Sequence, residues 1–184
     1  MSVEVNFTAI INPIETDKNF LTDIIDADLA AGKHAQRRWA GHPGTAADHA
    51  AWLPLWQGYQ RFYNATIAEE TSALTWQRFL DPAEPMHAAL AWRDGAAVGL
   101  VHYIFHRSCW TTGDYCYLQD LYVAENIRGG GIGRALIEHV YAQAAAAGAS
   151  RVHWLTQETN YQGRMLYDRI ADRSGFIQYR KLLA

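Results

Sequence analysis

The strongest chemical signal in this sequence of 184 residues is a run of glycines with an arginine at each end. The run spans residues 128–134 and reads Arg-Gly-Gly-Gly-Ile-Gly-Arg. Glycines let a backbone turn tightly and let several N–H groups point at one spot, because no Cβ stands in the way. A helix that begins here would add the partial positive charge of its N-terminus. Arg128 and Arg134 can add charge-assisted hydrogen bonds, so the run predicts a pyrophosphate site.

Three other interpretations explain the run less well. A Walker-type phosphate loop needs a Lys followed by Ser or Thr, and the run has no Lys. A dinucleotide-binding turn needs an early strand–helix–strand unit and an acidic residue about 20 residues further on. Arg151 stands near that distance instead. A plain turn without a ligand is the third alternative, but three successive glycines beside an arginine are unusual in such a turn.

The neighbouring segments predict which elements position this run. Apolar periodicity places a strand before it and a helix after it. Residues 93–95 read Arg-Asp-Gly, which predicts the turn of a hairpin between two apolar runs. The predicted helices cover residues 52–63, 71–80, 132–147 and 161–173, and the predicted strands cover residues 87–92, 97–106, 115–123, 151–156 and 176–182. This order predicts an α/β fold with a mixed, mostly antiparallel central sheet flanked by helices.

The run and its surroundings resemble the GNAT N-acetyltransferase superfamily. The pattern Arg128-x-x-Gly131-x-Gly133 looks like the family's acyl-coenzyme A loop. Tyr-Leu-Gln-Asp-Leu-Tyr-Val at 117–123 resembles the strand before that loop. Thr-Asn at 159–160, Leu-Tyr at 166–167 and Gly-Phe at 175–176 resemble its final helix and strand. The similarity covers residues 45–182, and its closest branch holds diamine (spermidine/spermine) acetyltransferases and small bacterial and fungal acetyltransferases that modify histones or amino acids.

The resemblance implies the GNAT acyl-CoA N-acyltransferase fold for residues 35–184, with acetyl-CoA as cosubstrate. In that fold the strand before the loop parts from the strand after the following helix, and the pantetheine arm lies between them. The implied cofactor-binding residues comprise three strand residues with backbone groups on the pantetheine, the loop residues on the pyrophosphate, and one Asn at the pantetheine or thioester end: Leu121, Tyr122 and Val123; Arg128, Gly129, Gly130, Gly131, Ile132, Gly133 and Arg134; and Asn160.

Two residues are candidates for the chemistry of transfer. Tyr167 follows Asn160 by seven residues, so both fall near one face of a helix. A phenol there can protonate the departing thiolate, although a buried aromatic would fit the same position. The related diamine enzymes carry an acidic pair on the strand, and here Gln119 replaces the first acid. Asp120 is therefore left to act as a base through waters or to bind a cationic substrate. Alternation places Gln119 and Asp120 on opposite sheet faces unless a bulge intervenes.

These residues predict an enzyme that moves acetyl from acetyl-CoA to a primary amine by direct attack in a ternary complex. The acceptor could be a polyamine, an amino acid or a lysine-like side chain of a peptide. The alternative is a non-catalytic sensor or scaffold that binds acyl-CoA without turnover. Dimers are common in this branch, so a homodimer is a further expectation.

Composition limits the remaining classes. Residues 1–30 hold six acidic side chains and one lysine, which predicts an acidic arm over residues 1–34 of unknown role. The charge balance of the rest argues against a nucleic-acid-binding face. No apolar stretch is long enough to span a membrane. The eight histidines lack the usual metal-ligand spacings, so no metal is expected. Two cysteines, Cys109 and Cys116, are too few for a disulfide framework, which favours the cytoplasm.

Overall fold

The computed structural model describes residues 46–183, which fall into two compact units that divide after Trp154. The acidic arm expected over residues 1–34 lies outside the described residues. The first unit opens with the helices α2 (Ala46–Phe62) and α3 (Glu69–Leu80). Both helices were predicted, because their aromatic and aliphatic residues repeat with a helical period.

The first unit contains a sheet of four strands in the order β1-β2-β3-β4. The strands are β1 (Met86–Arg93), β2 (Ala96–His106), β3 (Tyr115–Val123) and β4 (Arg151–His153). β1 and β2 form the predicted hairpin, in which Asp94 and Gly95 have φ values of 51° and 75°. A type I′ turn needs this pair of positive values. β1–β2 and β2–β3 are antiparallel and β3–β4 is parallel, which confirms the predicted mixed sheet.

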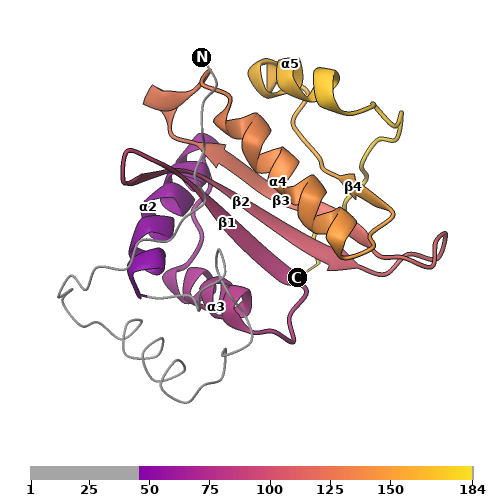
Figure 1. Cartoon of the computed structure of the whole chain (residues 1–184), viewed down its shortest axis with the longest axis horizontal. Helices are drawn as coiled ribbons and strands as arrows, with labels where there is room; N and C mark the ends of the chain where they lie inside the picture. Colours follow the sequence, from indigo (N-terminus) through magenta and orange to yellow (C-terminus); the bar gives the residue numbers. More distant parts are fainter. Residues whose placement is uncertain (1–45, 184) are drawn as a thin grey trace. The chain divides into compact units, whose positions relative to one another are not determined.

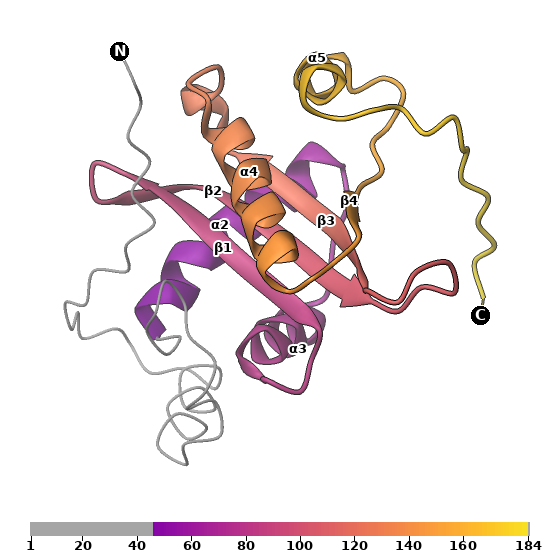
Figure 2. The same cartoon turned by 45° about the vertical axis from the view of Figure 1, so that its right-hand side comes forward.

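Helices cover both faces of the sheet (Figures 1 and 2). α2 and α3 lie on one face, and α4 (Ile132–Ala146) crosses the other. Four of the side chains that α2, α3 and β2 bury together are at most 1% exposed: Trp52, Trp76, Leu80 and Leu100. On the other face, α4 buries three side chains completely: Leu136, Ile137 and Val140. The two apolar layers fix the sheet between the helices and hold β3 in place.

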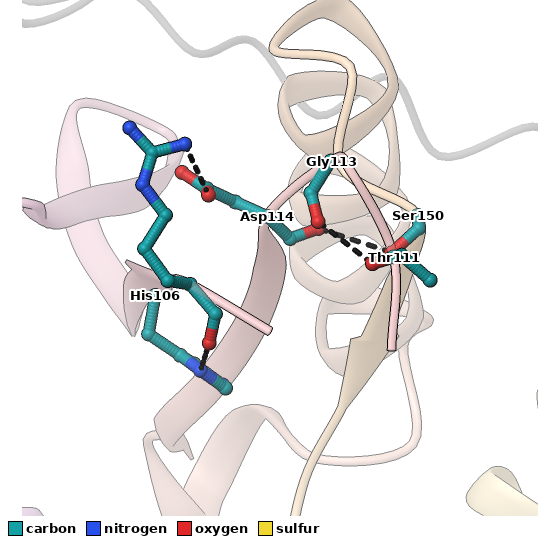
Figure 3. A network of polar contacts seen from close by, with 6 residues as sticks. His106, Thr111, Gly113, Asp114 and Ser150 are labelled. Carbon is teal, nitrogen blue, oxygen red and sulfur yellow. Dashed lines mark hydrogen bonds and ion pairs between the residues drawn. The ribbon is translucent and has the colours of Figure 1, made fainter. Parts of the chain in front are cut away.

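A polar network joins the loop before β3 to the loop before β4 (Figure 3). The Ser150 backbone N–H donates to the Asp114 carbonyl at 2.8 Å. Thr111 Oγ1 donates to the Gly113 carbonyl at 2.8 Å and lies 3.0 Å from Ser150 Oγ. Gly113 must stay glycine here, because a Cβ would stand 2.6 Å from the Gly148 carbonyl oxygen. The network therefore fixes where β3 and β4 meet.

The second unit, residues 155–184, contains the helix α5 (Tyr161–Ile170), which ends three residues before its predicted end. The strand predicted over residues 176–182 is wrong, because residues 171–183 form no strand. A strand forms only beside a partner that takes up its backbone hydrogen bonds, and sequence preference does not supply that partner. The apolar side chains of this segment are between 74% and 88% exposed: Phe176, Ile177, Tyr179, Leu182 and Leu183.

Candidate functional site

A bulge in β3 decides where Asp120 lies. Asp120 pairs with His102 of β2, whereas the next pair joins Leu118 to Tyr103, so Gln119 is an extra residue in β3. A bulge shifts the alternation of side chains by one position. Asp120 is consequently buried on the face that α2 covers, with 8% of its surface exposed, while Gln119 is exposed. The sequence analysis named a bulge as the exception to strict alternation along this strand, and β3 contains that bulge at Gln119.

A chain of three buried side chains ends at this carboxylate. Trp52 Nε1 of α2 lies 2.8 Å from His102 Nε2, and His102 Nδ1 lies 2.9 Å from Asp120 Oδ2. Trp52 is fully buried and His102 is 2% exposed. The sequence interpretation missed both residues. The available signal was a histidine at an inward position of an otherwise apolar strand, because buried histidines need polar partners.

Three tyrosines surround the same carboxylate. Tyr59 of α2 hydrogen-bonds to Asp120, and the charge of Asp120 also acts on Tyr63 and Tyr117. Burial, followed by this negative charge, raises the pKa of each phenol above its ordinary value. The phenols therefore stay protonated at neutral pH and can donate hydrogen bonds. Asp120 is thus an acid among hydrogen-bond donors and aromatic rings, which is a suitable environment for an amine or ammonium group.

The far half of β3 has a free edge on the side of β4. The two strands pair only over Tyr115–Tyr117 and Arg151–His153. β3 continues to Val123, so its edge from Leu118 onward has no partner in β4. The pairing ends before Leu121, Tyr122 and Val123, where the resemblance implies that the two strands part. Backbone groups on such an edge can bind an extended ligand by hydrogen bonds, as a further strand would.

The glycine run connects this edge to α4. Gly129 and Gly131 have φ values of 86° and 82°, which only glycine adopts without strain. Gly131 is the N-cap of α4, and no side chain caps this helix end. The first N–H groups of a helix have no acceptor within the helix, so those of Ile132, Gly133 and Arg134 point out of its N-terminus. The arrangement fits a pyrophosphate, whose oxygens accept hydrogen bonds from successive N–H groups.

Arg128 holds the loop against α2 and β3. Its Nε donates to the Val123 carbonyl at 3.1 Å. Its guanidinium carbon lies 5.3 Å from the ring centre of Phe62 and 5.8 Å from that of Tyr122. Glu125 lies 3.8 Å from its Nη2. Arg128 therefore has a structural task in addition to the phosphate contact that the sequence suggested, while about a quarter (26%) of its side chain stays exposed.

The two ends of the loop carry further cationic groups. Arg134, on the first turn of α4, lies 3.5 Å from Glu138 and is about half exposed, so it can turn toward a ligand. Arg93 Nη1 lies 3.7 Å from the position that a Cβ on Gly130 would occupy. The sequence interpretation missed Arg93. Antiparallel pairing brings the turn between β1 and β2 to the edge where β3 ends, so the predicted hairpin already contained this signal.

The remaining predicted residues lie in the second unit. Asn160 is the N-cap of α5, where its Oδ1 accepts from the Gly163 backbone N–H at 3.1 Å. Its Nδ2 donates to Thr156 Oγ1 at 3.0 Å. Asn160 thus stands just before the helix, and Tyr167 lies within it. The contacts of Asn160 explain its place at the helix start, and its part in cofactor binding stays a prediction.

The side chains and helices of residues 46–183 bear on metal and membrane binding. Within this range no group of three or more His, Cys, Asp or Glu side chains could hold a metal ion. No helix there has the length and apolar character needed to cross a membrane. Cys109 and Cys116 are both free; the first is exposed and the second is buried.

Comparison with known proteins identifies the family that the sequence resembles. Residues 52–171 match the model of the acetyltransferase (GNAT) family. The chain is 36% identical over 136 residues to a D-amino-acid N-acetyltransferase of Saccharomyces cerevisiae, across 73% of this chain and 84% of the yeast protein.

Solved structures show the same fold. A ribosomal-protein-alanine N-acetyltransferase from Brucella melitensis biovar Abortus 2308 is 25% identical with a TM-score of 0.60, and the match covers 74% of this chain and 93% of that one. An aminoglycoside acetyltransferase from an uncultured soil metagenomic sample is 20% identical with a TM-score of 0.64, over 75% and 93% of the two chains. The predicted α/β acetyltransferase fold is thereby confirmed.

Proposed function

The chain belongs to the acetyltransferase (GNAT) family and is an acetyl-transferring enzyme, and we propose that it moves acetyl from acetyl-CoA to the amine of a small molecule by direct attack in a ternary complex. The observation that carries the proposal is the unpaired edge of β3, which leads into a glycine turn at the start of α4. An extended, amide-rich arm with a pyrophosphate at one end matches that edge and turn.

The proposed cofactor contacts follow from this match. Backbone groups of Leu121, Tyr122 and Val123 bind the pantetheine arm, because their edge has no partner in β4 and no other strand of the described residues lies on that side of β3. The N–H groups of the loop bind the pyrophosphate, and Arg128, Arg134 and Arg93 balance its charge. The positive φ values of Gly129 and Gly131 support this assignment, because they aim successive N–H groups at one place.

The proposed acceptor is an amino acid or another small primary amine. The yeast relative is named a D-amino-acid N-acetyltransferase, which favours an amino acid over a polyamine or a lysine-bearing peptide. Asp120 faces the amine and binds it as a cation before reaction. An ammonium has no lone pair, so it first gives one proton to Asp120, directly or through a water. The freed lone pair then attacks the thioester carbon and forms the N–C bond, and the nitrogen loses its second proton to water. The C–S bond then breaks, and the thiolate of coenzyme A leaves.

The departing thiolate needs a proton in a poorly solvated site, and we assign its donation to Tyr167. A phenol can give that proton and recover it from solvent afterwards. The support is the position of Tyr167 within α5, two turns after the Asn160 cap. We assign Asn160 to the pantetheine or thioester end. Its Oδ1 accepts from Gly163 and one Nδ2 hydrogen goes to Thr156, so the second Nδ2 hydrogen can donate to the cofactor.

The test is thiol release from acetyl-CoA with a panel of amines: D- and L-amino acids, spermidine and a lysine-bearing peptide. Release above hydrolysis is expected, with the highest kcat/KM for an amino acid. Asp120→Asn should lower kcat/KM for the amine and leave acetyl-CoA affinity unchanged, which a calorimetric titration measures. If acetyl-CoA binds but no amine in the panel releases thiol, the proposed acceptor class is wrong, and a role as acyl-CoA sensor would fit better.

We further propose that the protein is a homodimer located in the cytoplasm. The exposed apolar side chains of residues 171–183 support the dimer, because a surface of that kind is usually covered by a partner. Light scattering should give twice the chain mass of 20.7 kDa, and a monomer mass would contradict it. The unpaired Cys109 and Cys116 support the location, which fractionation of cells would check.

A further inference from the structure

The buried chain from Trp52 to Asp120 contains a histidine that the transfer mechanism above does not use. We propose that His102 is a positioning residue: Trp52 fixes it as a neutral hydrogen-bond donor, and it holds the Asp120 carboxylate in place for the acceptor amine. The role toward the amine rests on the proposed function. The fixed donor state of His102 follows from the fold alone and can be tested without any substrate.

The hydrogen-bond partners determine where the imidazole carries its proton. An indole N–H can only donate, so the 2.8 Å contact between Trp52 Nε1 and His102 Nε2 requires a lone pair on Nε2. A neutral imidazole with a bare Nε2 carries its proton on Nδ1. His102 Nδ1 lies 2.9 Å from Asp120 Oδ2, so this N–H donates to the carboxylate. Both ring nitrogens are then satisfied in a single tautomer.

This tautomer prevents His102 from taking up the amine's proton. Nδ1 already bears a hydrogen, and a second proton on Nε2 would face the indole N–H of Trp52 at 2.8 Å. Two donors opposed at that distance repel each other. The arrangement therefore differs from a serine-protease triad, in which the imidazole itself carries the proton. In this site the proton from the amine stays on Asp120 or passes to water. His102 only orients the Asp120 carboxylate that takes up the proton.

The surroundings keep the imidazole from turning. The ring centres of Phe79 and Trp56 lie 4.6 and 5.3 Å from that of His102, so α3 and α2 enclose it. Four titratable groups face Asp120. They are His102 of β2, Tyr59 of α2, Tyr63 directly after α2, and Tyr117 of β3. A buried carboxylate is costly unless it accepts hydrogen bonds, and His102 supplies one of them. One tenth (10%) of the Asp120 side-chain surface stays exposed.

The first experiment reads the tautomer directly. Two-bond ¹H–¹⁵N correlation spectra of the uniformly labelled protein at pH 7 distinguish a protonated Nδ1 with a bare Nε2 from the other tautomer and from imidazolium. The His102 signals are assigned by their loss in His102→Asn. We expect a protonated Nδ1 and a bare Nε2. The opposite tautomer, or imidazolium, would overturn the proposal whatever the activity.

The second experiment separates positioning from simple structural support. The Asn amide of His102→Asn takes the place of Nδ1 and keeps the donor to Asp120, whereas the Gln amide of His102→Gln reaches the place of Nε2 and keeps only the partner of Trp52. A hydrogen bond to a charged group contributes about 1.5–3 kcal/mol, so kcat/KM for the amine should be about 10-fold or more lower in His102→Gln than in His102→Asn. The KM for acetyl-CoA should be the same in both. His87→Asn, on β1, is the matched control and should retain wild-type kinetics.

The outcomes distinguish the two proposals. Equal kcat/KM in His102→Asn and His102→Gln, with both variants folded by circular dichroism, would show that His102 is merely structural and would overturn the inference. If the tautomer is as expected but no amine in the panel releases thiol, the proposed function fails and the fixed donor state stands. If His102→Gln does not fold, Trp52→Phe replaces it, because loss of the indole N–H should then allow the second tautomer to appear in the spectrum.

Discussion

Replacement of Gly131 by alanine should destabilise the protein, whereas the same change at Gly130 should not. Gly131 has a φ of 82°, where an L-residue with a Cβ is strained by about 1–2 kcal/mol. Gly130 has no such φ, and its added Cβ would stand 3.6 Å from the Ile127 carbonyl oxygen, an ordinary contact. Both substitutions reduce the entropy of the unfolded chain by the same amount, so that contribution cancels in the comparison.

The difference in unfolding free energy between the two variants should therefore equal the left-handed strain, about 1–2 kcal/mol. Urea denaturation followed by tryptophan fluorescence measures it, with equal m-values as the check that both variants unfold from similar structures. Equal stability of Gly130→Ala and Gly131→Ala would refute the reasoning, because the loop could then not hold residue 131 at a positive φ.

A comparison of Gly131→Ala with a third variant, Gly148→Ala, tests whether the loop binds the cofactor. Gly148 also has a positive φ, 72°, and open space around it, but it follows the other end of α4. Gly148→Ala should lose about as much stability as Gly131→Ala and keep its affinity for acetyl-CoA. Gly131→Ala should bind acetyl-CoA more weakly, since strain at the N-cap turns the loop N–H groups away from one point. A titration that finds equal affinity in these two variants would separate the loop from cofactor binding.

Three further outcomes are expected. Tyr167→Phe should lower kcat and leave the Kd of acetyl-CoA unchanged, and an unchanged kcat under conditions where chemistry limits the rate would remove Tyr167 from the acid role. Cys109 should react with Ellman's reagent in the native protein, whereas Cys116 should react only after unfolding, because burial raises the pKa of its thiol to about 11; two fast thiols in the native state would contradict this. Burial lowers the pKa of His49 and His139, so the unfolded chain binds more protons below about pH 6.5 and the unfolding free energy should fall as the pH drops through that range. Urea denaturation at pH 5 and pH 8 measures the change, and equal stability at both would count against burial of these rings.

Local signals in the sequence were sufficient for most of the fold. The hairpin followed from Asp94-Gly95, since that pair accepts the two positive φ values of its turn. The start of α4 followed from the glycine run, and β3 was placed at its observed bounds. These elements depend on neighbours within a few residues, which is the range over which periodicity and turn chemistry act.

The errors concern features that depend on distant partners. β4 ends at His153 rather than at residue 156, because its pairing with β3 stops there. The segment 176–182 has strand-forming residues, but a strand also needs a neighbour, and composition does not reveal whether one is present. Asp120 was identified as a candidate, but the rest of the buried chain was not, because His102 lies 18 residues before Asp120 and Trp52 lies another 50 residues before His102.

Helix α2 explains how the two halves of the site are held together. Its Trp52 and Tyr59 reach the Asp120 cluster, while Phe62 packs under the Arg128 guanidinium beside the glycine loop. Between them, Gly58 allows the Tyr122 ring to lie against the helix, because a Cβ there would stand 2.7 Å from the phenol oxygen. One helix thus sets both the position of the carboxylate and the end of β3. A shift of α2 would move the acceptor side and the cofactor side together, so changes in this helix should alter both KM values rather than one.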